Sequence, residues 1–330
     1  MVSSGAKLIT SCFNLLILIF FVVFFTFSPS ASAQLQKTGV TVTPVTDEFT
    51  AEPGTVLSRK VRVINPSPEV ITVFPRVLNF HTDNEAGQPV FYSLNERSSR
   101  YAISEWVSFS KPFLRVAPNE EEIFETIINV PANAEPGGHY GAILFSTEEP
   151  KLETDLTQIG VIGMVGTLLL ANVPGETIQK MTLTYFEAPR LVIRPPANFS
   201  VAFQNSGNVH LKPQGELKIR NWSGSASAVL DVNEAGGNIL PESKRRFENI
   251  WQFDWKTIGR FTATAAITYG SPEQQLTASR TFYVIPLWFL IVFGALIALI
   301  IWLFFRRRRP RKIYTNSLPP TVKPPRIVMR

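Results

Sequence analysis

The chain has 330 residues and a single cysteine, Cys12, which lies in an apolar stretch near the N-terminus. The near absence of cysteine excludes a disulfide-stapled scaffold and a thiolate metal centre for the rest of the chain. Disulfides are not needed at this length, because roughly 250 residues between the terminal segments can bury enough apolar surface for stable cores. The length corresponds to about two domains.

Histidine is also scarce, and the three present, His81, His139 and His210, stand far apart without a second histidine or a cysteine nearby. The nucleophile elbow G-x-S-x-G, the P-loop and a G-x-G-x-x-G turn after a strand are all lacking. The acidic runs at 83–85 and 120–122 do not have the pattern of a calcium loop. A hydrolase would need converging carboxylates, and no pattern singles out such a pair. The sequence therefore predicts no catalytic residue, no cofactor and no metal, in a protein that is not an enzyme.

Acidic residues are lacking at the C-terminus, where residues 306–330 hold nine basic residues and no acidic one. The formal net charge of +6 comes from this segment, because the remainder, apart from Lys7, has 22 basic against 26 acidic residues. A body that binds nucleic acid would show a basic patch or stripe. We therefore expect no nucleic-acid partner.

Two long apolar runs are present, and the first lies near the N-terminus. Lys7 precedes an apolar run over 15–27, and Ala31-Ser32-Ala33 follows it. A short basic region, an apolar region and an A-x-A site are typical of a secretory signal peptide. A run of 13 residues is shorter than the roughly 20 that span a bilayer, so an uncleaved anchor is the less favoured alternative. We predict a signal peptide over 1–33.

The second apolar run, over 285–305, has 21 residues and no charge. Tyr283 and Trp288 flank its beginning and Trp302 lies near its end, as in the aromatic belts of membrane spans. Four basic residues follow at once: Arg306, Arg307, Arg308 and Arg309. A buried core helix is the alternative, but it would not need four consecutive arginines. The pattern predicts a transmembrane helix over 284–305.

The arginines also predict the topology, because basic residues beside a span remain on the cytoplasmic side. We expect a single-pass type I protein of the cell membrane, with an extracellular body and a cytoplasmic tail over 306–330. The tail contains five prolines and no helical or strand period, so it is predicted to be extended. Its basic residues are expected to contact anionic membrane lipid, and a partner-binding role of the PxxP type is the less favoured alternative.

The body between the apolar runs is predicted to be all-β. Short β-branched and aromatic runs alternate there with proline, glycine and asparagine turns, a pattern typical of β-sandwiches. The expected strands include 56–64, 70–77, 124–130, 141–145, 159–173, 183–186, 197–204, 215–221, 226–232, 250–255, 259–269 and 276–283. A joint at 173–176 divides the body into two tandem immunoglobulin-like β-sandwich domains, over 34–176 and 177–283.

Five side chains are candidate contacts for a ligand or partner. Trp251, Phe253 and Trp255 alternate along a predicted strand and would share one of its faces. Buried, they would anchor the second core; exposed, they would form a stacking platform for sugars or a partner. His139 and Tyr140, in the segment 137–141, are the other two, and for His139 the alternative is a structural role in a turn or strand start, with its ring bonded locally.

Several of these segments are similar to one known family. They are Glu52-Pro53-Gly54, 61–67, 130–132, 137–143, 165–170 and 173–175 in the first domain, and 203–215 in the second. With them, the first domain resembles the peptidoglycan-binding, immunoglobulin-like domain of WxL-interacting surface proteins of Gram-positive bacteria. The second domain resembles that family's second immunoglobulin-like module. The signal peptide, the two β domains, the span and the basic tail match the family's layout.

The resemblance implies a non-enzymatic binding or adhesion protein at the bacterial cell surface. The distal domain would bind cell-wall glycan (peptidoglycan) or another bacterial surface protein. The alternative is a membrane-anchored chaperone or assembly factor for secreted surface proteins. Such a protein would hold its client by β-strand addition to an open sheet edge. The sequence predicts no particular oligomeric state.

Overall fold

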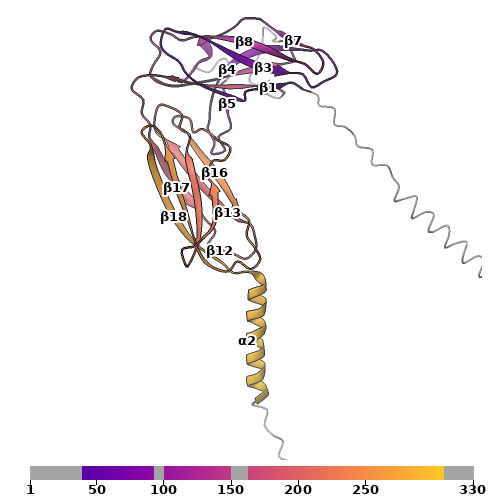
Figure 1. Cartoon of the computed structure of the whole chain (residues 1–330), viewed down its shortest axis with the longest axis vertical. Helices are drawn as coiled ribbons and strands as arrows, with labels where there is room; N and C mark the ends of the chain where they lie inside the picture. The colour runs from indigo at the N-terminus through magenta and orange to yellow at the C-terminus, as the bar shows by residue number, and fades with distance from the viewer. Residues whose placement is uncertain (1–38, 93–99, 150–162, 308–330) are drawn as a thin grey trace, which may run out of the picture.

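The computed structural model describes residues 39–92, 100–149 and 163–307, and these form two β-sandwiches followed by one helix (Figure 1). The all-β, immunoglobulin-like fold class is thereby confirmed. The predicted signal peptide over 1–33 lies outside the described residues. The tail beyond Arg307, with Arg308 and Arg309, lies outside them as well.

The first sandwich, called domain one, contains two sheets. One sheet has the strand order β1-β3-β8-β6 and the other has the order β2-β10-β9-β4-β5, with β7 also paired to β4. The strands are β1 (Thr41–Thr43), β2 (Thr46–Thr50), β3 (Val56–Ile64), β4 (Ile71–His81), β5 (Val90–Phe91), β6 (Val107–Phe109), β7 (Leu114–Val116), β8 (Glu121–Asn129), β9 (Gly137–Ser146) and β10 (Val165–Val173). A 3₁₀ turn, η1 (Ser104–Trp106), precedes β6.

The N-terminal segment of domain one belongs to both sheets. β1 pairs antiparallel with β3, and after Pro44 the chain crosses to the other sheet, where β2 pairs parallel with β10. Between the sheets, the buried rings of Phe124 and Phe145 meet edge to face with their centroids 5.3 Å apart. Since β2 has only β10 beside it among the described strands, it forms one edge of its sheet.

The second sandwich, called domain two, has a three-stranded sheet, β11-β13-β16, and a five-stranded sheet, β12-β18-β17-β14-β15. The strands are β11 (Met181–Glu187), β12 (Leu191–Val192), β13 (Ala197–Asn205), β14 (Gln214–Asn221), β15 (Ala226–Asp231), β16 (Lys244–Trp251), β17 (Gly259–Tyr269) and β18 (Gln274–Val284). Phe199 and Phe282 join the two sheets through an edge-to-face contact at 5.4 Å. Trp251 lies 6.0 Å from Phe282 in the same core.

Several strands differ in their bounds from the sequence prediction, and two of them matter for the site. Of the predicted strand over 159–173, the structure has β10 from Val165 onward, and residues 159–162 lie outside the described residues. β16 ends at Trp251, so the predicted strand over 250–255 is wrong beyond its first two residues. β9 begins at Gly137, earlier than expected, and nearly all of it is buried. The reason is that Ile143 and Phe145 face the core between the sheets, whereas Tyr140 and Leu144 belong to a second cluster on the opposite face. A strand covered on both faces has no polar alternation.

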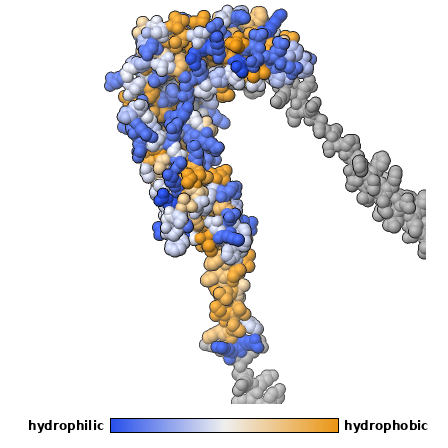
Figure 2. All heavy atoms as spheres, viewed as in Figure 1, coloured by the Kyte–Doolittle hydropathy of each residue, from blue (hydrophilic) through white to orange (hydrophobic). Residues whose placement is uncertain are grey.

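The C-terminal helix α2 (Leu287–Arg307) follows β18 after two residues, Ile285 and Pro286. Its length and composition are sufficient to cross a membrane, and none of its side chains is buried in the structure. Figure 2 shows α2 as an apolar column below domain two that ends in hydrophilic side chains. These include Arg306 and Arg307, in the last turn of the helix.

Candidate binding site at the domain junction

Domain one lies across the end of domain two that is opposite α2 (Figure 1). Leu240, in the segment between β15 and β16, is buried in a cluster otherwise made by domain one. Its buried partners there are Phe80, Tyr140, Ala142, Leu144 and Leu170. Burial of one leucine side chain contributes about 1.5–3 kcal/mol. Part of the apolar outer face of the β9 sheet is therefore covered by the other domain.

Main-chain hydrogen bonds also cross the junction. The Gly138 N–H donates to the Asn208 carbonyl at 2.8 Å, and the Arg246 N–H donates to the Glu85 carbonyl at 2.7 Å. Through the second bond, the turn between β4 and β5 covers part of the edge of β16. The carboxylate of Glu85 also accepts a hydrogen bond from the Tyr185 hydroxyl at 2.6 Å. Contacts of this kind hold the two sandwiches in one arrangement.

Arg245 fills a narrow space between the domains. A Cβ atom placed on Gly87 of domain one would lie 2.7 Å from the guanidinium carbon, and one on Gly237 of domain two would lie 2.5 Å from it. The Nη1 atom donates to the Asn238 carbonyl at 2.8 Å. Burial lowers the pKa of Arg245. A side chain at either position would displace the guanidinium from this space, and Gly87 in addition has a positive φ of 69° that favours glycine.

His139 and Tyr140, two of the predicted contact residues, are buried at this junction. His139 lies against Trp106 with ring centroids 4.4 Å apart, and its two ring nitrogens lie 3.3 Å and 3.0 Å from the carbonyl oxygens of Ala102 and Glu135. The Tyr140 hydroxyl lies 3.4 Å from Nδ1 of His210. Their contacts are those of packing residues, which corresponds to the structural alternative.

Burial also determines the protonation of the Tyr140 and His210 pair. It raises the pKa of Tyr140 and lowers the pKa of His210 from its ordinary value of 6.5. The nearby Glu48 carboxylate opposes the shift at His210, and Lys212 reinforces it. The junction therefore favours the uncharged form of both side chains.

A cleft of about 610 Å³ opens beside this pair, between β2 of domain one and the loops of domain two. It is lined by Glu48, Phe49, Thr50, Asn172, Gln179, Val209, His210, Leu211, Lys212, Gln214, Thr268, Tyr269, Gly270, Ser271 and Glu273. Most of the lining side chains are polar, and both charge signs are present. Such a surface can form many hydrogen bonds with an extended ligand.

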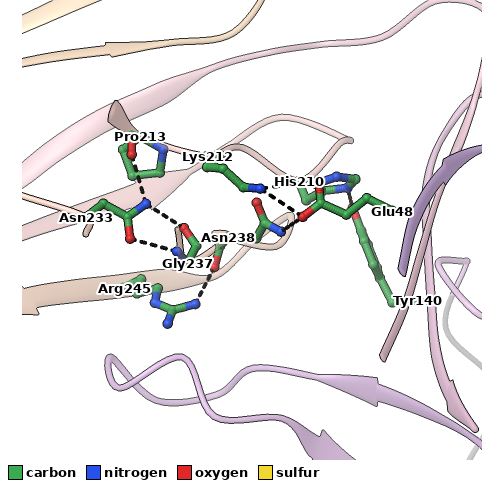
Figure 3. A network of polar contacts seen from close by, with 9 residues as sticks. All are labelled: Glu48, Tyr140, His210, Lys212, Pro213, Asn233, Gly237, Asn238 and Arg245. Atoms are coloured by element: carbon green, nitrogen blue, oxygen red, sulfur yellow. Dashed lines mark hydrogen bonds and ion pairs between the residues drawn. The ribbon is translucent and has the colours of Figure 1, made fainter. Parts of the chain in front are cut away.

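A polar network lies beside the cleft (Figure 3), and Glu48, His210 and Lys212 of this network line it. The Glu48 carboxylate accepts hydrogen bonds from Nζ of Lys212 at 3.1 Å and from Nδ2 of Asn238 at 2.6 Å. Burial alone would raise the pKa of Glu48, but these hydrogen bonds and the positive charge of Lys212 outweigh burial and lower it. The network ties β2 of domain one to domain two.

Two acceptor atoms near the cleft have no partner among the described residues. They are Oδ1 of Asn172, in the cleft wall, and Oδ1 of Asn238, beside Glu48. Leaving a buried acceptor without a donor costs about 1–3 kcal/mol. Both atoms are themselves buried, so a ligand in the cleft would reach them only after a rearrangement of the side chains.

The edge strand β2 leads into the cleft. The Leu168 N–H donates to the Val45 carbonyl, and the Ala51 N–H donates to the Asn172 carbonyl, both at 2.9 Å. Because main-chain groups alternate in direction along a strand, the N–H and C=O groups of Thr46, Glu48 and Thr50 point away from β10. No described strand lies on that side. These groups form an open edge that another extended chain could pair with.

The three predicted aromatic contacts have different environments. Trp251 is 4% exposed and packs in the core of domain two, and Phe253 is partly buried against it at 4.9 Å. Trp255 is 64% exposed and lies at the α2 side of the domain. The expectation of one shared strand face is wrong, because the chain leaves the strand after Trp251.

Two of the predicted topology residues, Arg306 and Arg307, lie at the far end of α2. Arg306 and Arg307 close the helix, and the Arg306 guanidinium lies 5.2 Å from the centre of the Trp302 ring. Within the part of the chain that the structure describes, no three His, Cys, Asp or Glu side chains gather as metal ligands would.

Sequence reasoning missed the cleft, because its walls come from segments that are more than 100 residues apart. Glu48 and Lys212 belong to different domains, and each is ordinary in its own sequence context. The segment 46–50, Thr-Asp-Glu-Phe-Thr, contains one apolar residue and no alternation, so it carries no strand signal for this edge.

No protein-family model and no curated protein sequence matches the chain. Similar solved structures include a chain of the chaperone–tip adhesin complex of CFA/I fimbriae biogenesis (11% identity, 73% of this chain and 98% of that chain, TM-score 0.36). Others are the class 5 fimbriae chaperone CfaA (12%, 76% and 100%, TM-score 0.37) and the Pseudomonas aeruginosa CupB2 chaperone (14%, 73% and 99%, TM-score 0.33). At these values the similarity carries no argument about function.

Proposed function

We propose that this chain is a membrane-anchored, non-enzymatic binding protein of the cell surface that holds an extended segment of another surface protein. The observation that carries the proposal is the open edge of β2 beside the polar cleft. The segment would add to the edge as a further strand and continue into the cleft. Main-chain hydrogen bonds supply affinity in such complexes, and pockets for side chains supply specificity.

The donors and acceptors at the site suit a polypeptide. Thr46, Glu48 and Thr50 each offer one N–H and one C=O on the open side. Lys212 and Glu273 give the cleft both charge signs, so it can accept polar side chains of either charge.

The family resemblance suggests which proteins to test. A relative of WxL-interacting surface proteins would have its body outside a Gram-positive cell and its tail in the cytoplasm. Its partner would be a surface protein of the same cell. The signal peptide, the type I topology and the membership of this family are parts of the proposal.

The first test removes the open edge without disturbing the sheet. Thr50→Pro deletes an N–H that points away from β10, and proline is tolerated on edge strands. Thr50→Val keeps the N–H and the shape, so it is the matched control. The full chain in lipid nanodiscs is incubated with a surface-protein extract and, separately, with purified peptidoglycan. We expect the wild type and Thr50→Val to retain one surface protein and Thr50→Pro to lose it.

A cross-linker locates the contact. p-Benzoylphenylalanine at Thr46 should form a covalent adduct with the retained protein, whereas the same residue at Thr277, on β18, should not. Retention that Thr50→Pro leaves unchanged would contradict the proposal, as would retention of peptidoglycan alone. Pulse labelling can show whether the complex persists. Dissociation of the complex once the partner is mature would instead indicate a chaperone.

A further inference from the structure

The end of domain two nearest α2 carries an unusual number of exposed apolar side chains. Three loops meet there, 190–196, 221–225 and 252–258, and we call them the rim. The exposed apolar residues at the rim and on the adjoining end of β18 are Leu191, Ile193, Trp222, Trp255, Ile258 and Tyr283. Trp222 is 80% exposed and Trp255 is 64% exposed. Indole rings are rarely left in water without a partner.

Strand register places all three loops at the same end. Leu191 pairs with Tyr283, Asn221 pairs with Phe261, and the loop 252–258 connects the ends of β16 and β17. Gly259 pairs with Val284, three residues before α2 begins. The rim therefore surrounds the point at which the chain enters the helix.

Direct contacts fix the depth of the rim relative to the helix. Nε1 of Trp288, in the first turn of α2, donates to the Trp255 carbonyl at 2.8 Å, and the two rings meet edge to face at 6.0 Å. A Cβ atom on Gly259 would lie 3.8 Å from Cδ1 of Trp222. Three residues of extended chain span about 10 Å, so Trp222 also lies near the level of the helix start.

The headgroup region of the bilayer lies at the level where a transmembrane helix begins. The headgroup region adds about 10–15 Å in total to a hydrocarbon core of about 30 Å, which gives several ångströms on each side. Tryptophan and tyrosine concentrate in this layer, with the apolar ring toward the chains and the polar group toward water. Trp222, Trp255, Trp288 and Tyr283 have the chemistry and the position for it.

Charge at the rim is mostly positive. Arg190, Arg194, Lys256 and Arg260 are exposed, and Asp254 is the acidic residue among the three loops. Nζ of Lys256 lies 5.5 Å from the centre of the Trp255 ring, so a cation and an indole face the same region. Basic residues near an anionic lipid surface contribute about 1 kcal/mol each.

A groove of about 560 Å³ runs between two of the loops. Trp222 lines one side, and Phe253, Asp254 and Lys256 line the other. It combines apolar walls with a charged mouth. A lipid headgroup with the upper part of its chain has this combination of properties.

We propose that the rim is a lipid-binding surface that sits in the bilayer interface around α2, with Trp222 and Trp255 as its principal contacts. The occupant follows from the chain itself, because the rim adjoins the start of a helix that can cross a membrane. The proposal rests on α2 as a span and is independent of the cleft at the other end of domain two.

The test places a fluorescent reporter at the rim of the full chain. Cys12→Ser removes the native thiol, and Ser223→Cys, next to Trp222, accepts a nitrobenzoxadiazole label. Thr277→Cys, an exposed site higher on β18, is the matched control. In proteoliposomes we expect the label at 223 to emit at shorter wavelength and to be quenched by doxyl lipids roughly twofold more than the label at 277. The quenching should increase with the fraction of anionic phosphatidylglycerol.

Two further measurements keep the outcome decisive. Trp222→Ser combined with Trp255→Ser should reduce the quenching at 223 while the melting temperature in detergent stays unchanged. Equal, water-like emission at 223 and 277 would overturn the proposal. The proposal would also be overturned if the short-wavelength emission of the label at 223 disappeared on dilution to one chain per vesicle. In that case a second copy of the chain, and not lipid, would cover the rim.

Discussion

The two ends of domain two differ in where their partners lie. At the junction end, Leu240, His210 and the Asn208 carbonyl are all covered by domain one. At the α2 end, Trp222 and Trp255 are exposed. Both ends are built from loops of one sandwich, so the difference is one of context. The junction end is buried because its partner, domain one, belongs to the same chain. The α2 end is exposed because its proposed partner is membrane lipid.

The largest expected effect on stability comes from substitution of Trp251, which is buried near the α2 end of domain two, and not of the exposed Trp255. Trp251 contacts Phe261 at 5.4 Å and Phe282 at 6.0 Å in the core. Trp251→Ala should lower the free energy of unfolding by about 3–5 kcal/mol. Trp255→Ala in detergent should change it by no more than about 0.5 kcal/mol. Denaturant unfolding of the full chain measures both, and similar losses would remove the distinction between core and rim.

An intermediate effect is expected at the junction end. Leu240→Ala leaves a cavity in the cluster of domain one and should cost about 2–5 kcal/mol. Because Leu240 joins the domains, the variant should unfold in two transitions where the wild type shows one. Leu191→Ala, at the exposed rim, is the control and should keep the wild-type profile. Calorimetry shows the difference, and a single unshifted transition for Leu240→Ala would mean that the junction is held by other contacts.

The smallest effect concerns the pH dependence of the junction. Burial lowers the pKa of His210, so below about pH 6.5 the unfolded chain takes up a proton that the folded chain does not. Stability should therefore fall as the pH falls through this range. The lowered pKa of Glu48 acts in the same direction, but only below its ordinary value of 4.5. His210→Gln should make the melting temperature less dependent on pH between about 7 and 5. An unchanged slope would contradict this assignment.

Much of the fold could be predicted because strand signals are local. β17 has the bounds expected from its alternation, and the uncharged run over 285–305 falls within a few residues of α2. The asparagines at two strand ends also have a structural role that explains their presence there. Asn65 and Asn205 are both fully buried, and each amide nitrogen donates to main-chain carbonyls where the following turn meets a distant strand or loop. In both domains the asparagine follows or ends a strand, its Oδ1 accepts from the N–H two residues on, and its Nδ2 donates to the carbonyl four residues on, so the same local arrangement occurs twice.

The site was less predictable because it depends on packing between domains. Tyr140 is buried because Leu240, which lies 100 residues later in the chain, packs in the same cluster. The sequence around Tyr140 does not contain this information. Trp251, Phe253 and Trp255 looked like one face because alternation over five residues fits a strand. The strand ends at the first of them, and the polar residues Gln252 and Asp254 then lie in a loop. Local spacing alone could not indicate that end.

The connection between β18 and α2 leaves no room for a hinge. Ile285 and Pro286 are the only residues between strand and helix, and the Ile285 N–H is itself bonded to the Val192 carbonyl at 2.9 Å. The contacts at the junction also hold the two domains to each other, so the proposal that α2 spans a bilayer implies a nearly fixed height of the β2 edge above it. A partner segment would then bind only where it reaches that height. The length of the partner's stalk would therefore contribute to selectivity, in addition to its side chains.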